Sequence, residues 1–218
     1  MDDIIKQYDT IWKDYTQEQK KYFSAKWDFP LEYIKNNIWD LNWKKILDLW
    51  CWDGHDIAYF ETKYDADFWG IDSSEYMIGQ AKNNIKNPQS LHIWNFQNMP
   101  FEDNFFDVIY AKYSFSYLSD FELVYKEVTR VLKEWWLFLF IQNHPLNDFM
   151  KKKQKLYFQK QKLTVWLFSG VNITYFTHIF SEIISPTFLR NFNLLDFHED
   201  FRWENVNPRY VAIKSVKS

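Results

Sequence analysis

The sequence has few of the residues that would crosslink a fold or cross a membrane. Its 218 residues contain a single cysteine, which excludes a disulfide framework and a cysteine-based zinc site. The longest strongly apolar run, Trp135–Ile141, is far shorter than the ~20 residues that span a bilayer. The acidic start, Met1–Asp9, lacks the basic-then-apolar pattern of a secretory signal. We therefore expect a cytoplasmic protein with no membrane partner.

A strong excess of one charge is also missing. The chain has 26 basic and 29 acidic residues, a net charge of −3. This balance argues against a protein that grips nucleic acid by counterion release. The basic run Lys151–Lys153 is expected to be a solvated helix face rather than a binding patch.

Glycine is scarce and tryptophan abundant. Glycine occurs 4 times, about 2% of the chain, where globular proteins average about 7%. Tryptophan occurs 12 times, although it is normally among the rarest residues. Together the two make up about 7% of the chain, the usual share of glycine alone. The positions of the tryptophans therefore need an explanation.

Short apolar runs alternate with amphipathic stretches from Lys45 onward. This order predicts an α/β fold, with a doubly wound and mainly parallel sheet and helices on both faces. Strands are expected at 45–49, 66–71, 90–94, 106–111, 137–142, 194–202 and 209–216, and helices at 55–63, 74–85, 121–132 and 181–191. The length fits a single domain, 1–218. We divide it into an N-terminal helical cap (1–40), a sheet core (44–142), a lid or insertion (145–176) and a C-terminal helix with an edge hairpin (177–218).

The first strand runs into Asp48-Leu49-Trp50-Cys51-Trp52-Asp53-Gly54. In open α/β sheets ligands bind beyond the carboxyl ends of the strands, where a turn must be tight and free of large side chains. The large side chains of Trp50 and Trp52 do not meet that requirement. With glycine at 50 and 52, the segment resembles the first motif of class I S-adenosylmethionine-dependent methyltransferases, D/E-x-G-x-G-x-G.

Three further segments carry the same resemblance in the same order. Trp69–Ser74 is similar to the ending of the family's second strand, and Met99–Ile109 to its L-P-F…F-D-V-V stretch. Arg130–Leu137 resembles its R-V-L-K-P-G-G-x, again with tryptophan at both glycine positions. The matches extend over about residues 44–145, nearly half of the chain.

The resemblance implies a Rossmann-like, seven-stranded sheet with an antiparallel C-terminal hairpin, S-adenosylmethionine as cofactor, no metal, and a small-molecule methyl acceptor. It makes residues 44–142 the cofactor-binding core, in which Asp48 helps to hold the methionine amino group and Asp72 takes the ribose hydroxyls. Ser73, beside Asp72, is a further cofactor contact. The remaining implied contacts are the backbone at Trp50, Cys51, Trp52 and Gly54, the adenine neighbours Met77, Asn95 and Phe96, and Ala111 beside the methionine part.

Purely structural roles remain open for several of these residues. Asp48 can accept hydrogen bonds from loop amides, Asp72 can cap a helix, and Met77 can be a core residue. Cys51 is best explained as a small side chain that fills space in the turn. The catalytic candidate is His144, which follows the fifth strand; histidine is the residue type most suited to taking a proton near neutral pH. The alternative for His144 is a loop histidine bonded to backbone.

Six tryptophans occupy positions where glycine is expected, namely 43, 50, 52, 94, 135 and 136. A bulky residue with positive φ is an outlier. Our hypothesis is that the source organism translates UGA codons of this gene as glycine, whereas the printed sequence translates the same codons as tryptophan. The alternative is a true Trp-rich chain, a non-catalytic scaffold with a blocked cofactor site. A dinucleotide-dependent oxidoreductase fits less well, because its G-x-G-x-x-G spacing is not met even with glycine at 50 and 52.

Overall fold

The computed structural model describes residue 11 and residues 29–94, 98–152, 156–168, 171–200 and 207–218. Its elements in chain order are α3 (Phe29–Asn37), β1 (Lys45–Leu49), α4 (His55–Glu61), β2 (Asp67–Asp72), α5 (Glu75–Ala81), η1 (Pro88–Ser90), β3 (Leu91–Ile93), β4 (Phe106–Lys112), η2 (Ser114–Tyr117), α6 (Glu122–Val131), β5 (Leu132–Asn143), α7 (Pro145–Lys151), β6 (Lys162–Phe168), β7 (Val171–Phe176), α8 (Phe180–Ile183), α9 (Pro186–Asn191), β8 (Phe192–Glu199) and β9 (Tyr210–Lys217).

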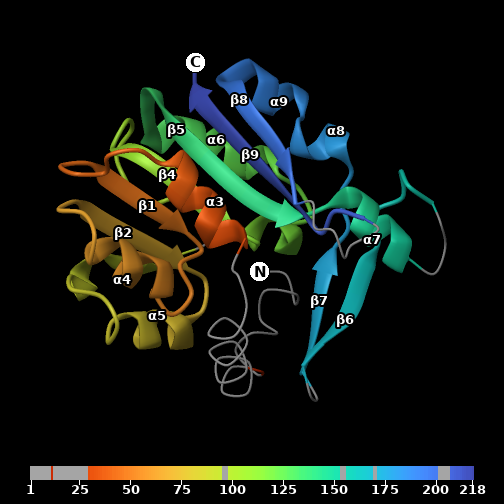
Figure 1. Cartoon of the computed structure of the whole chain (residues 1–218), viewed down its shortest axis with the longest axis horizontal. Coiled ribbons are helices and arrows are strands. Elements are labelled where there is room, and N and C mark those ends of the chain that lie inside the picture. The colour runs from red at the N-terminus through yellow and green to blue at the C-terminus, as the bar shows by residue number, and fades with distance from the viewer. Residues whose placement is uncertain (1–10, 12–28, 95–97, 153–155, 169–170, 201–206) are drawn as a thin grey trace.

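A seven-stranded sheet in the order β3-β2-β1-β4-β5-β9-β8 forms the centre of the molecule (Figure 1). Strands β1 to β5 pair in parallel, while β9 pairs antiparallel with both β5 and β8. The strand order reverses between β1 and β4, so the sheet has its topological switch point there. The expected doubly wound sheet with an antiparallel C-terminal hairpin is confirmed.

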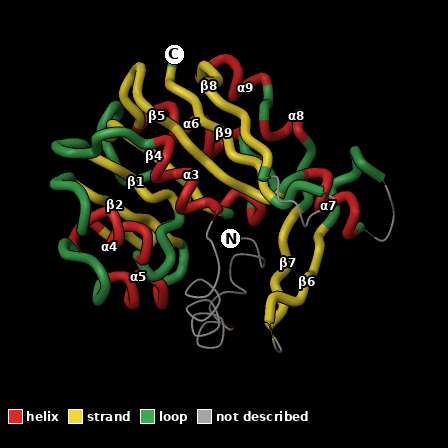
Figure 2. The backbone as a smooth tube through the Cα atoms, in the orientation of Figure 1, coloured by secondary structure: helices red, strands yellow, loops and turns green. Residues whose placement is uncertain are grey.

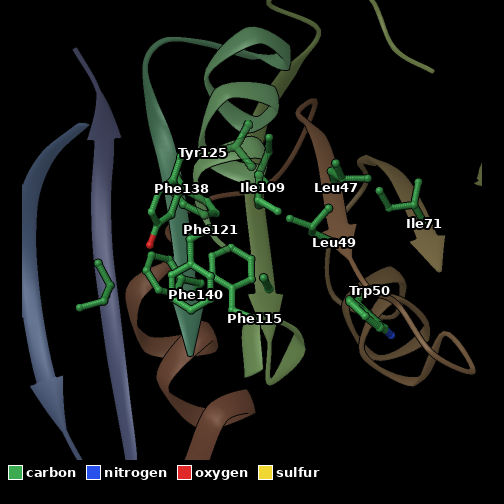
Figure 3. Packing of buried hydrophobic residues seen from close by; sticks show 14 of the residues in the cluster. Leu47, Leu49, Trp50, Ile71, Ile109, Phe115, Phe121, Tyr125, Phe138 and Phe140 are labelled. Carbon is green, nitrogen blue, oxygen red and sulfur yellow. The ribbon is translucent and has the colours of Figure 1, made fainter. Parts of the chain in front are cut away.

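The alternation of side chains along the strands produces two cores, one on each face. Leu47 and Leu49 of β1 pack with α6 and α9, whereas Ile46 packs with α3, α4 and α5. Both sets are buried because successive strand residues point to opposite faces of a sheet. Figure 3 shows the first core, in which Ile109 and Phe115 lie beside Leu49 and the rings of Tyr125, Phe138 and Phe140 pack farther along the same face.

The segment between β5 and α8 is an insertion built from α7 and a two-stranded hairpin. Strands β6 and β7 pair antiparallel with each other and form a sheet of their own. The hairpin extends from the side of the molecule to which the strands β1, β2 and β5 point (Figure 2). Ile173, Tyr175 and Phe176 of β7 are buried in the same core as η2. The insertion therefore lies at the ligand-binding edge of the sheet.

Several boundaries differ from the expected ones. Helix α5 ends at Ala81 rather than at Ile85. Strand β5 starts at Leu132, five residues earlier than expected, because residues 133–136 bulge out between two paired stretches with β4. The single helix expected at 181–191 is two short helices, since Ser185 caps a new helix whose first residue is Pro186.

Candidate cofactor site

The turn between β1 and α4 has a left-handed backbone at three alternate residues. The φ angles are 86° at Trp50, 53° at Trp52 and 74° at Gly54. Only glycine adopts this conformation without steric cost. At Gly54, a Cβ atom would also lie 2.9 Å from Cγ2 of Ile85, so glycine is required there on two grounds. The spacing of these three residues is that of the glycines in the family motif.

Backbone hydrogen bonds tie this turn to the end of β2. The amides of Trp50 and Cys51 both donate to the carbonyl of Ile71, each at 2.9 Å. The amide of Gly54 donates to the carbonyl of Cys51 at 2.8 Å and closes the turn. The turn is thus held by main-chain atoms, which do not depend on the side chains at 50 and 52.

Asp72 lies at the carboxyl end of β2 and is 2% exposed. Its Oδ2 accepts a hydrogen bond from the amide of Trp52 at 3.1 Å, and its Oδ1 accepts from the amide of Ser74 at 2.9 Å. The helix cap of α5 is Ser74, whose hydroxyl accepts from the amide of Met77. Asp72 therefore joins the two turns, with Ser73, half-buried, between it and the cap.

Asp48 belongs to a buried network below the turn. The hydroxyl of Tyr110 donates to Asp48 Oδ2 at 2.9 Å. Burial, followed by the negative charge of Asp56, raises the pKa of Asp48 well above its ordinary value. Asp56 itself pairs with Lys112 at 2.7 Å. The network holds a carboxyl group at the carboxyl end of β1, where the resemblance places a ligand of the cofactor.

The indole of Trp50 is buried in the same cluster as residues that the resemblance assigns to the cofactor. It is 6% exposed, and its ring centroid is 5.7 Å from that of Tyr117. The same buried cluster contains Met77 and Ala111, which the resemblance assigns to opposite ends of the cofactor. Figure 3 shows the indole beyond the end of β1. The turn backbone and Asp72 thus fit S-adenosylmethionine, whereas the indole at position 50 does not.

Cys51 is a buried filler, as the sequence favours. A Cβ atom at Gly70 would lie only 2.7 Å from its Sγ, so β2 passes tightly against it. Burial raises the pKa of the Cys51 thiol well above its ordinary value. A buried thiol with a raised pKa is a poor nucleophile.

His144 is the N-cap of α7 and is 2% exposed. Its Nδ1 accepts from the amide of Leu146 at 3.1 Å, and its Nε2 lies 2.7 Å from Oε1 of Glu199. With Nδ1 accepting, Nε2 carries the proton and donates to Glu199. These contacts support the backbone-bonded alternative, and the role of His144 as a base stays a prediction.

Asn95 and Phe96, the expected adenine neighbours, lie outside the described residues. The sequence did not single out Tyr110, Tyr117, Asp148 or Tyr175. Tyr110 alternates with core residues of a strand and could have been noticed there. For Tyr117 and Tyr175, which come from a 3-10 turn and from the hairpin, the sequence carries no signal.

Two tryptophans away from the site also have a left-handed backbone, the conformation that favours glycine. Trp43 has φ 65° in a turn closed by the amide of Lys44 and the carbonyl of Leu41. Trp135 has φ 66° in the bulge of β5. Both indoles are more than two-thirds exposed. Trp94 and Trp136, by contrast, are not in the left-handed region, so backbone geometry supports glycine at four of the six positions.

A cavity of about 190 Å³ lies elsewhere, between the start of α6 and the α8 region. It is lined by residues that include Lys160, His178 and Glu182, none of them from the ends of β1 or β2. Within the described ranges, no group of three or more His, Cys, Asp or Glu side chains could hold a metal ion. Nor does any helix there have the length and apolarity needed to cross a bilayer.

Comparison with known proteins agrees with this geometry. Residues 47–138 match the family model described as methyltransferase domain. Over this stretch, less than half of its length, the chain is similar to a methyltransferase domain. S-adenosylmethionine is the cofactor of that family, and the matched stretch begins in β1 and extends into β5.

Two curated relatives are methyltransferases that match part of the chain. A sterol 24-C-methyltransferase from Gibberella zeae is 31% identical over 111 residues, which is 49% of this chain and 29% of that protein. A demethylmenaquinone methyltransferase from Staphylococcus haemolyticus is 31% identical over 93 residues, 41% of this chain and 39% of that protein. The chain therefore spans well under half the length of these relatives.

Solved structures share the fold over most of this chain. A candidate S-adenosylmethionine-dependent methyltransferase from Listeria monocytogenes superimposes with a TM-score of 0.70 at 22% identity, covering 86% of this chain and 97% of that one. The [4+2]-cyclase SpnF has a TM-score of 0.62 at 14% identity, covering 86% and 80%. The fold is thus shared by proteins with different chemistry, and function must be argued from the site.

Proposed function

We propose that the protein transfers the methyl group of S-adenosylmethionine to a small, partly apolar acceptor, and that residues 50 and 52 of the natural chain are glycine. The observation that carries the proposal is the β1–α4 turn. Its backbone is left-handed at 50, 52 and 54, and it is tied to the carboxylate of Asp72. Such a turn suits a cofactor that approaches the main chain closely.

Each part of the site has a task in this proposal. Asp72 accepts hydrogen bonds from the ribose hydroxyls, and Asp48 holds the amino group of the methionine part. The main chain at residues 50–54 lines the cofactor, while Met77 and Ala111 pack against its two ends. S-adenosylmethionine supplies, when bound, a sulfonium methyl group that is already electrophilic. The protein then contributes alignment and exclusion of water.

The apolar character of the acceptor is supported by the insertion. Ile173 and Phe176 are buried at the edge where the methyl group would be presented. The two relatives are named for a sterol and a demethylated menaquinone, both largely apolar. The near-neutral net charge also favours such an acceptor over nucleic acid.

A non-catalytic scaffold is the second candidate, and the buried indole of Trp50 favours it if tryptophan is the natural residue. The codons at 43, 50, 52 and 135 decide between the two. UGA codons, together with an intact mass of the natural protein that matches glycine, support the methyltransferase. UGG codons contradict the recoding and leave the scaffold as the better explanation.

The binding experiment is calorimetry with S-adenosylmethionine on the printed chain and on the variant with Trp50→Gly and Trp52→Gly. We expect binding only by the glycine variant. The matched control is Trp39→Gly, since Trp39 is exposed, distant in sequence from the motif and not left-handed. Equally tight binding by the printed chain would refute the steric argument.

A further inference from the structure

A buried polar pair lies between α7 and the hairpin, and the cofactor site described above does not use it. The hydroxyl of Tyr175, in β7, donates to Oδ1 of Asp148, in α7, at 2.9 Å. Both residues are 2% exposed. Burying a carboxylate is costly without strong partners, so a pair of this kind requires a structural or functional reason.

The pair belongs to the same core as the end of the sheet. Tyr175 and Trp50 are members of one buried cluster, and β7 packs on η2, the turn that follows β4. Tyr117 of that turn is near enough to Tyr175 to contribute to the raised pKa of its phenol. The ring of Tyr117 in turn contacts the indole of Trp50. With glycine at 50, the volume that the indole occupies beside Tyr117 would be free, within the buried cluster that also contains Tyr175.

We propose that Tyr175 and Asp148 form the acceptor-binding pair and take the proton of a hydroxyl group on an otherwise apolar acceptor. This rests on the proposed function. The apolar neighbours Ile173, Phe115 and Phe176 suit the body of such a molecule, while the pair is the polar group that orients it. The acceptor class is thus a largely apolar alcohol or phenol.

The proton and electron pairs balance in the proposed step. The acceptor hydroxyl gives its proton to Oη of Tyr175, whose own proton passes to Oδ1 of Asp148. The acceptor's electron pair forms the bond to the methyl carbon, and the pair of the broken carbon–sulfur bond stays on sulfur. Asp148 ends protonated and later releases its proton to solvent.

The charges around the pair are compatible with this role. Burial raises the pKa of Asp148 to about 6, partly offset by Lys151, the Tyr175 hydroxyl and Lys152. Tyr175 is also near Tyr210 of β9, and Arg209 is near Lys151. A carboxyl group with this pKa is ionised at neutral pH and can accept a proton.

The test uses the chain with glycine at 50 and 52, and 1-naphthol as the hydroxyl probe. Calorimetry measures the binding of 1-naphthol and of 1-methoxynaphthalene, which has the same rings but no proton to give. Tyr175→Phe keeps the ring and removes the hydroxyl. Tyr157→Phe, in the same insertion, is the matched control. Circular dichroism and the melting temperature confirm folding of each variant.

We expect Tyr175→Phe and Asp148→Asn to weaken 1-naphthol binding at least about tenfold, and to leave 1-methoxynaphthalene and S-adenosylmethionine binding unchanged. Methyl transfer from labelled cofactor to 1-naphthol should fall by roughly 10²-fold or more. Its rise with pH through about 6 should disappear in Asp148→Asn. Tyr157→Phe should behave as the parent.

Equal 1-naphthol binding by the parent and by Tyr175→Phe would overturn this proposal, as would no binding by the parent. Failure of the proposed function has a different signature. In that case the parent does not bind S-adenosylmethionine, while 1-naphthol still binds in a Tyr175-dependent manner. The pair would then be a hydroxyl-binding site without methyl transfer.

Discussion

The rings of Trp50 and Tyr117 contact each other with centroids 5.7 Å apart, at the carboxyl ends of β1 and β4. The contact closes the place where the cofactor of this family would lie. Trp50 has a backbone conformation that suits glycine, and Tyr117 belongs to η2, the turn on which the hairpin also packs. In the proposed function, cofactor and acceptor binding therefore both depend on which residue stands at position 50.

The first prediction concerns position 50 alone. Trp50→Gly should produce measurable S-adenosylmethionine binding, because it removes the indole and relieves a left-handed tryptophan. Trp50→Ala removes the indole but keeps a Cβ at φ 86°, so it should bind more weakly than the glycine variant. Calorimetry compares the three chains. Equal affinity of the alanine and glycine variants would show that side-chain volume alone matters.

The second prediction concerns folding stability at the two exposed left-handed tryptophans. Trp43→Gly and Trp135→Gly should each raise the free energy of unfolding by up to about 1 kcal/mol. A left-handed non-glycine residue costs roughly 1–2 kcal/mol, and part of the gain is offset because glycine loses more conformational entropy on folding. The melting temperature should rise by about 2–4 °C for each.

Trp39→Gly is the control for both, since Trp39 is 78% exposed but has no positive φ. It should give no increase in melting temperature. An equal increase at all three positions would mean that surface hydrophobicity, not backbone strain, is the cause.

The third prediction concerns Asp72 in the chain with glycine at 50 and 52. Asp72→Ala should weaken S-adenosylmethionine binding by roughly 1.5–3 kcal/mol, the range for hydrogen bonds to a charged group. The carboxylate also holds the amides at 52 and 74, so the variant should lose some stability. Ser74→Ala, which removes the cap of α5, should lose stability but keep its affinity. A similar loss of affinity in both variants would mean that Asp72 affects binding by holding the turn in place rather than by contacting the cofactor.

The fourth prediction is the pH dependence contributed by Asp148. Its pKa is about 6 in the folded protein and about 4 in an unfolded chain, so folding favours the protonated form. Its stabilising contribution is complete below pH 4 and is lost as the pH rises through 6. The difference is about 3 kcal/mol. Asp148→Asn lacks this dependence. The free energies of unfolding of the two proteins, measured with urea from pH 4 to pH 8, should therefore become equal at the acid end of the range. A constant difference would contradict the shift.

The fifth prediction separates the two roles of His144. His144→Ala should lower stability by about 1 kcal/mol, as expected for loss of an N-cap. His144→Asn restores a capping acceptor and should recover that stability. We expect turnover of the asparagine variant to stay within a few-fold of the parent, because both ring nitrogens are engaged in the fold. A loss of 10²-fold with unchanged cofactor affinity would identify His144 as the base.

Much of the fold was predictable because its signals are local. The KILDL strand, β4 and α6 follow from short apolar patterns, and β1 has the expected bounds. The left-handed positions 43, 50, 52 and 135 were also predictable, because a turn or bulge constrains the backbone whatever the side chain. The bulge at 133–136 moved the start of β5, since its first residues pair with β4 before the chain loops out.

The sequence by itself thus determined the order of the sheet strands along the chain, the carboxylate at the end of β2, and the left-handed backbone at 43, 50, 52 and 135. Trp94 and Trp136, also expected at glycine positions, are not left-handed. Only the tertiary structure decided what the tryptophan at 50 displaces and what His144 contacts. It alone brought Tyr175 to Asp148, 27 residues apart in sequence, by folding the hairpin onto the turn after β4. The reason is physical. Backbone conformation is set by neighbours along the chain, whereas the partners of a buried side chain are set by which distant elements pack together.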